Sequence, residues 1–342
     1  MNHRIRGVLA APTLVMVFGL TLAGTPPASA VAESAHGTSA SDSGRPVVIF
    51  VHGRGQLPGD SAAVRAEWSR VLRSGASALA GAPVLRDEDM WLAWYADALD
   101  PLSPPVCASH RQAGADPAAT EQGGDGLRPV FTAVGEGLVA LLDVFDGYAR
   151  EEARALAGDL LFLGDAVRRC AGETRLEDAL ARAARERRPV ILVAHSFGSL
   201  LSYGYLRSLS SGGASRFEIR RFVTIGSLLG APGARELLLG DTVATAVLPP
   251  AVRAWTNIVD VRDALAYSIE FGNDADSSRV ENLTTTAGAT GADAHDVLRY
   301  LRDPVTVRSV ASAWCQSFQG GAGQRAPEGC SVIAPAGTSP GR

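Results

Sequence analysis

Ser196 stands where the sequence could place a reactive hydroxyl. It lies in VILVAHSFGSLL, residues 190–201, where an apolar stretch rich in β-branched residues gives way to an amphipathic one. A tight strand-to-helix turn exposes its central side chain at the carboxyl edge of a sheet and requires small neighbours, here Ala194 and Gly198. The small-x-Ser-x-Gly pattern is weak by itself, because residues 208–212 match it too. The strand before Ser196 and the helix after it single this serine out.

A serine hydroxyl is a poor nucleophile until a base takes its proton, and histidine is the usual base. The chain has six histidines. His195 adjoins the serine, and we expect it to face away from the serine side chain. His295 alone follows the later predicted strands, where the chain order nucleophile, acid, base places the base. The sequence therefore favours His295 as the general base.

The acid that would orient this histidine must lie between Ser196 and His295, on a loop at the carboxyl end of a strand. Of the carboxylates in this interval, Asp260 and Asp263 directly follow a convincing strand, WTNIV at 255–259. Asp263 lies further onto the loop and can turn toward an imidazole. Asp260, the alternative, could instead fix the loop by bonding to its backbone. We therefore predict Asp263 as the acid.

Acyl transfer also needs donors for the oxyanion that develops on the reacting carbonyl. Two backbone N–H groups would serve here. One belongs to Phe197, directly after the serine. The other belongs to Arg54, in the turn His52-Gly53-Arg54-Gly55 that follows the first apolar run. The Arg54 guanidinium could also meet an anionic group on a substrate.

Alternating strands and helices must position these residues. Apolar runs predict strands at 46–51, 90–96, 190–195, 221–225, 254–259 and 279–284. Helical periodicity predicts helices at 61–80, 130–149, 151–170 and 174–187, another after Ser196, and one that begins at His295. This alternation predicts an α/β fold with a mostly parallel central sheet and helices on both faces. Ligands of such sheets bind at the carboxyl ends of the strands.

With these residues assembled, the chain resembles the α/β-hydrolase superfamily, and in particular bacterial secreted lipases and esterases. Five motifs carry the resemblance in order: VHGRG at 51–55, VAHSFG at 193–198, VTIGS at 223–227, WTNIVDVRD at 255–263 and AHDVLRY at 294–300. The resemblance implies the α/β-hydrolase fold. It also implies a serine hydrolase in which Ser196 is the nucleophile, Asp263 the acid and His295 the base.

Composition excludes several other classes. The sequence contains no lysine, which rules out a P-loop and a Schiff-base lysine. Its formal net charge of −4 argues against a nucleic-acid partner, which needs a clustered basic face. No spacing typical of metal ligands is present, so we expect neither a metal nor another cofactor.

The four cysteines, Cys107, Cys170, Cys315 and Cys330, favour disulfides in an exported protein. Four cysteines allow three connectivities. We prefer pairing between nearest neighbours, Cys107 with Cys170 and Cys315 with Cys330.

The N-terminal residues have the layout of a secretory signal peptide: Arg4 and Arg6, then an apolar stretch, then Ala28-Ser29-Ala30. We expect cleavage after Ala30, and an uncleaved membrane anchor is the alternative. Residues 31–45 are predicted to be a flexible segment, 46–318 the hydrolase domain, 100–129 a long insertion within it, and 319–342 a tail partly tethered by a disulfide.

The resulting expectation is a secreted, monomeric hydrolase of carboxylic esters that meets the membrane only through its signal peptide. Its substrate would be a small-molecule or lipid ester, cleaved through an acyl-Ser196 intermediate. Two alternatives remain open. An alcohol acceptor in place of water would make the protein an acyltransferase, and loss of catalysis would leave a binding protein on the same fold.

Overall fold

The computed structural model describes residues 43–54, 59–96, 107, 166–209, 216–231, 234–235, 246–272, 278–286, 291–318 and 325–334. All of them belong to one compact unit of the chain, Thr38–Arg342. The predicted signal peptide, nearly all of the predicted flexible segment, the helix at 130–149 and the insertion at 100–129, apart from Cys107, lie outside the described residues.

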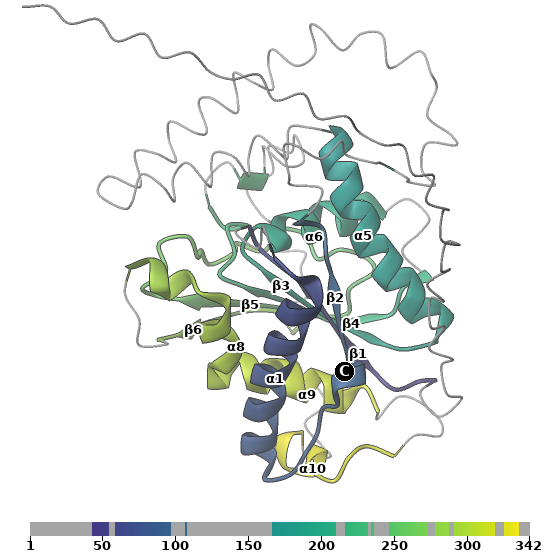
Figure 1. The fold of residues 1–342 in the computed structure, drawn as a ribbon. Helices are drawn as coiled ribbons and strands as arrows, with labels where there is room; N and C mark the ends of the chain where they lie inside the picture. The colour runs from purple at the N-terminus through teal and green to yellow at the C-terminus, as the bar shows by residue number, and fades with distance from the viewer. Residues whose placement is uncertain are drawn as a thin grey trace, which may run out of the picture. The chain divides into compact units, whose positions relative to one another are not determined.

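The described strands form one parallel sheet in the order β2-β1-β3-β4-β5-β6 (Figure 1). Its strands are β1 (Val47–Val51), β2 (Met90–Ala93), β3 (Val190–His195), β4 (Ile219–Ile225), β5 (Trp255–Asp260) and β6 (Val280–Thr285). Every neighbouring pair is parallel. The continuous apolar runs of β1 and β3 are buried throughout, as expected of strands covered on both faces. The predicted α/β class with a mostly parallel sheet is confirmed.

Helices cover both faces of this sheet (Figure 1). On one face lie α5 (Ala166–Arg185) and α6 (Phe197–Ser208). On the other lie α1 (Ser61–Ala80), α8 (Val297–Arg302), α9 (Pro304–Gln316) and the short α10 (Cys330–Ile333). Side chains of β3 alternate between the two cores: Leu192 and Ala194 face the α5–α6 side, and Val193 faces the other. Ala194 is fully buried, so an alanine methyl fits beside the serine.

Several predicted elements differ from the structure. The helix expected to begin at His295 begins at Val297, and His295 instead ends a short 3₁₀ helix, Gly291–His295. β2 ends at Ala93, three residues earlier than predicted. The chain leaves the sheet after Ala93 because the Tyr95 N–H donates to the side chain of His52, at Nε2, and not to a neighbouring strand. The described end of the helix predicted at 151–170, residues 166–170, forms one continuous helix, α5, with the helix predicted at 174–187. A Cβ at Gly172 would lie 3.0 Å from Leu201 Cδ1 on α6, so the glycine permits close helix packing and does not end the helix.

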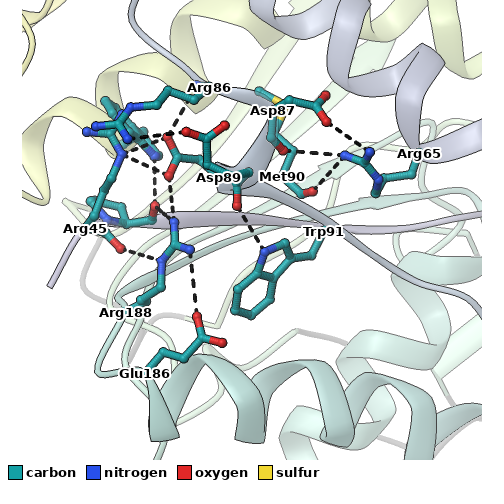
Figure 2. A network of polar contacts seen from close by, with 12 residues as sticks. Arg45, Arg65, Arg86, Asp87, Asp89, Met90, Trp91, Glu186 and Arg188 are labelled. Carbon is teal, nitrogen blue, oxygen red and sulfur yellow. Dashed lines mark hydrogen bonds and ion pairs between the residues drawn. The ribbon is translucent and has the colours of Figure 1, made fainter. Parts of the chain in front are cut away.

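The amino-terminal ends of β1, β2 and β3 are held together by a buried cluster of charged side chains (Figure 2). Asp89 ends the short 3₁₀ helix η2 (Asp87–Asp89) and accepts both Arg45 Nε at 2.8 Å and Arg188 Nη2 at 2.7 Å. Arg188 also donates to the carbonyls of Arg45 and Pro46, and the Trp314 indole donates to the Pro46 carbonyl. The cluster therefore joins the start of β1 to η2, to β3 and to α9.

Both predicted disulfides are present, with the preferred connectivity. Cys107 pairs with Cys170 of α5, and Cys315 of α9 pairs with Cys330 at the start of α10. The second bond ties residues 325–334 of the predicted tail to the sheet domain. Disulfides are typical of proteins in oxidising, extracytoplasmic environments.

Candidate active site

The predicted functional residues follow four strands of the sheet. Arg54 comes after β1, Ser196 after β3, Asp263 after β5, and His295 after β6, at the end of the 3₁₀ helix η7 (Gly291–His295). Because all the strands are parallel, their carboxyl ends meet at one edge of the sheet. This edge is opposite the Asp89 cluster.

Ser196 occupies a strained turn between β3 and α6. Its φ of 51° and ψ of −124° are unusual for a residue with a side chain, and its N–H donates to the Ile225 carbonyl of β4. The turn brings the first residues of α6 against β1: a Cβ at Gly198 would lie 2.5 Å from the His52 carbonyl oxygen and 2.6 Å from that of Val51. Only glycine fits there, as the strand–turn–helix prediction requires.

Ser196, His295 and Asp263 form one hydrogen-bonded chain. His295 Nδ1 lies 2.8 Å from Asp263 Oδ2, and His295 Nε2 lies 2.8 Å from Ser196 Oγ. A carboxylate only accepts, so the Nδ1–H donates to Asp263 and the Nε2 lone pair of the neutral ring can accept the serine proton. The side chain of His295 is 20% exposed and that of Asp263 is 1% exposed, so the imidazole meets solvent and the carboxylate does not.

The structure separates the two candidate acids. The Asp260 side chain accepts the Arg262 N–H at 2.9 Å, which fixes the turn after β5. Asp263 instead accepts the Leu265 N–H on Oδ1 and His295 Nδ1–H on Oδ2. Burial would raise the pKa of Asp263, but hydrogen bonds and charge from its partners outweigh burial, and its pKa is lowered. Asp263 is therefore held as a carboxylate against the imidazole.

Comparisons with protein-family models, with curated proteins and with solved structures find no match. What the site can do is therefore argued from its geometry.

The loop after β1 is fixed beside the serine by His52. Tyr95 N–H donates to His52 Nε2 at 3.1 Å, so His52 carries its proton on Nδ1 and donates it to the Gly53 carbonyl at 2.7 Å. The Tyr95 hydroxyl donates to the His52 carbonyl, and the two rings stack with centroids 4.1 Å apart. A Cβ at Gly53 would lie 3.0 Å from Ser196 Cβ, which places this loop directly over the serine.

His195 has a role that the sequence analysis did not assign. As predicted, its side chain does not contact Ser196 Oγ among the described hydrogen bonds. Its Nε2–H donates instead to the backbone carbonyl of His295 at 3.0 Å, so the residue before Ser196 holds the segment that carries His295. Burial, followed by the charge of nearby His295, lowers the pKa of His195 to about 3. His195 is therefore neutral at physiological pH.

Tyr300 is the other contributor that the sequence analysis missed. Its hydroxyl donates to Asp263 Oδ2 at 2.8 Å. In the sequence, Tyr300 ends the AHDVLRY motif, and no role was predicted for it. The sequence offered no spacing signal for this contact, because five residues correspond to about 1.4 helical turns, which would put His295 and Tyr300 on nearly opposite faces of a helix.

Two further observations concern the described residues. None of their His, Cys, Asp and Glu side chains gather in a group of three or more that could hold a metal ion. No helix among them combines the length and apolar character required to cross a bilayer.

Proposed function

We propose that this protein is a serine hydrolase of carboxylic esters, with the α/β-hydrolase fold and Ser196 as its nucleophile. The observation that carries the proposal is the unbroken chain of hydrogen bonds from Ser196 Oγ through His295 to Asp263. The three groups have the order, the tautomer and the distances that nucleophilic catalysis by serine requires. The positive φ of Ser196 supports the same reading, because strain of this kind is stored at functional turns.

In the proposed reaction, Ser196 Oγ attacks the ester carbonyl carbon while His295 Nε2 takes the hydroxyl proton. Asp263 stabilises the imidazolium that forms. The tetrahedral intermediate collapses, the carbon–oxygen bond to the alcohol breaks, and His295 returns its proton to the leaving alkoxide. Water then attacks the acyl-serine, gives a proton to His295, and the carboxylic acid leaves as Ser196 is reprotonated.

Two backbone N–H groups would stabilise the oxyanion. Phe197 begins α6, so its N–H is among the first-turn donors that have no acceptor within the helix itself. The second is the Arg54 N–H, whose direction is set by the preceding carbonyl: in a trans peptide the N–H points opposite to the C=O. Since His52 Nδ1–H holds the Gly53 carbonyl, it also holds the orientation of the Arg54 N–H.

The order of the strands supports the hydrolase fold. The nucleophile follows β3 in the middle of the sheet, and the predicted oxyanion loop follows its neighbour β1. The acid and the base follow β5 and β6 on the other side. This is the arrangement in which the nucleophile precedes the acid and the acid precedes the base. With the two disulfides and the predicted signal peptide, we infer that the enzyme acts outside the cytoplasm on a small-molecule or lipid ester.

The test is hydrolysis of p-nitrophenyl esters of graded acyl length, together with labelling by a fluorophosphonate probe. Wild-type protein should turn over at least one ester and be labelled. Ser196→Ala should abolish labelling and lower kcat by about 10⁶-fold, toward the uncatalysed rate.

Asp263→Asn should lower kcat by about 10³- to 10⁴-fold, because the amide favours the wrong imidazole tautomer. Asp260→Asn is the matched control, because an amide oxygen can still accept the Arg262 N–H.

A folded wild type that neither hydrolyses these esters nor reacts with the probe would overturn the proposal and leave a binding protein. Labelling without hydrolysis, with product appearing only when an alcohol is added, would instead identify an acyltransferase. If Asp260→Asn and Asp263→Asn exchanged their effects, the assignment of the acid would be wrong.

A further inference from the structure

Asp263 receives a hydrogen bond that the three-residue mechanism does not use. The Tyr300 hydroxyl lies 2.8 Å from Asp263 Oδ2, the same oxygen that accepts His295 Nδ1–H. With the Leu265 N–H on Oδ1, the carboxylate has three donors. Tyr300 is 1% exposed, so water does not compete for this contact.

The hydroxyl can point its proton in one direction only. Tyr300 Oη accepts the Asp260 N–H at 3.1 Å, and this leaves its single proton for Asp263. Burial and the charge of Asp263 raise the pKa of Tyr300, so the phenol keeps that proton. One side chain thus bridges the end of β5 to the carboxylate that follows it.

Gly226, the residue after β4, packs closely against the ring of Tyr300. A Cβ at Gly226 would lie 3.2 Å from Tyr300 Cε2 and 3.3 Å from Asp263 Oδ2, and the φ of Gly226 is 57°. Any side chain at this position would press on the ring and the carboxylate together. The close packing therefore depends on a glycine in the VTIGS motif.

His295 and Tyr300 reach Asp263 Oδ2 from one short segment. His295 ends η7, and Tyr300 lies in α8, which begins two residues later. A carboxylate gripped by both groups cannot rotate about its Cβ–Cγ bond without losing at least one of them. The segment that carries both His295 and Tyr300 therefore sets the orientation of the Asp263 carboxylate relative to His295.

We propose that Tyr300 is a positioning residue that holds the Asp263 carboxylate in the orientation that serves His295. The inference rests on the proposed function, since it concerns the efficiency of that same triad. Tyr300 acts through Asp263 and does not touch the reacting atoms.

The decisive variant is Tyr300→Phe, which removes the hydroxyl and keeps the ring. We expect kcat to fall by about 10- to 100-fold with KM nearly unchanged, as for a loss of alignment at the reacting groups. The acid limb of the pH profile of kcat/KM should move to higher pH. The donor stabilises the charged carboxylate, so without it the Asp263–His295 pair binds its shared proton more tightly.

Tyr203→Phe is the matched control. Tyr203 is also buried, and its hydroxyl accepts the Val247 N–H at 3.1 Å, away from the triad. This variant loses a buried hydroxyl too, so it reports what such a loss does to stability alone. Its kcat and pH profile should match those of the wild type.

A double-mutant cycle with Asp263→Asn separates positioning from general stability. If Tyr300 acts through Asp263, Tyr300→Phe should reduce kcat much less in the Asp263→Asn background than in the wild type. Equal reductions in the two backgrounds would overturn the inference. So would a Tyr300→Phe enzyme with the kcat and pH profile of Tyr203→Phe.

A second measurement serves if Tyr300→Phe does not fold. In the wild type, the enclosed hydroxyl proton should give a slowly exchanging low-field NMR signal that moves in Asp263→Asn. A folded, active wild type without this signal would count against the inference. A wild type without hydrolysis or probe labelling would instead reject the proposed function itself.

Discussion

At the scale of single residues, the three histidines of the site differ in what their ring nitrogens contact. His295 donates from Nδ1 to Asp263 and presents Nε2 to the Ser196 hydroxyl. His52 also donates from Nδ1, to the Gly53 carbonyl, whereas His195 donates from Nε2 to the His295 carbonyl. The partner of each ring fixes its tautomer. The side chain that we propose as the base is therefore the partly exposed one, and the two buried rings hold the loops on either side of it.

The buried, neutral His195 predicts a specific loss of stability in acid. The unfolded chain binds a proton on this residue below about pH 6.5, whereas the folded protein resists protonation down to a pKa of about 3. Between these values the unfolded state holds up to one more proton, so the free energy of unfolding falls as the pH falls, by up to about 1.4 kcal/mol per pH unit. Above about pH 6.5 the residue contributes no pH dependence.

His195→Gln should remove the pH dependence of the free energy of unfolding that comes from His195. A glutamine amide can still donate to the His295 carbonyl, but it does not titrate. Urea denaturation at pH 7, 6, 5 and 4 should therefore give a shallower decline for the variant than for the wild type, with similar stability at pH 7. Parallel declines would show that His195 is protonated in the folded protein.

At the scale of elements, the sequence predicted the helices and strands whose hydrophobic pattern is contained within the element itself. The helix at 61–80 has the bounds of α1, and the apolar runs at 46–51 and 190–195 match β1 and β3 to within one residue. The errors lie where a distant partner decides the outcome. β2 ends early because Tyr95 bonds to His52, more than forty residues back in the chain. α5 continues through Gly172 because α6 packs closely against it.

The same distinction holds for the candidate site. Chain order and position after strands were enough to select Ser196, Asp263 and His295, which the structure brings together. The hydrogen bonds of Tyr300 and His195 depend on how α8 and η7 pack against the sheet. No spacing in the sequence encodes that arrangement, so these two contributions had to be read from the structure.

Two helical glycines offer a test of element packing. Gly198→Ala would place a Cβ 2.5 Å from the backbone oxygen of His52, and backbone cannot rotate away as a side chain can. We expect a loss of more than about 3 kcal/mol in the free energy of unfolding, together with reduced kcat because the loop after β1, which we propose to hold the oxyanion, is displaced. Urea denaturation and ester hydrolysis measure the two effects.

Gly172→Ala is the matched control. The new methyl would meet Leu201 Cδ1 at 3.0 Å, the end of a side chain that can move. Alanine also favours the helix by up to about 1 kcal/mol, so the net change should stay within about 1 kcal/mol with kcat preserved. A Gly198→Ala enzyme as stable and as active as Gly172→Ala would show that α6 does not pack tightly on β1.

At the scale of the whole molecule, the two edges of the sheet have different tasks. The carboxyl ends of the strands hold the proposed triad, the strained turn at Ser196 and the partly exposed ring of His295. The opposite edge holds a closed ion cluster, in which Asp89 is fully buried between Arg45 and Arg188. This division predicts that stability and catalysis can be altered separately.

Asp89→Asn should therefore destabilise the protein without changing its chemistry. Removing the carboxylate leaves two buried guanidinium groups without their shared counter-charge, which costs about 3–5 kcal/mol. Asp87, two residues earlier, pairs with Arg65 at 2.9 Å but has a side chain that is 44% exposed, so Asp87→Asn should cost less than about 1 kcal/mol. Urea denaturation should separate the two variants, whereas kcat, measured well below each melting temperature, should equal that of the wild type in both. Should kcat fall in Asp89→Asn while the protein is still fully folded, the two edges would be coupled through β1 and β3, and the division would be wrong.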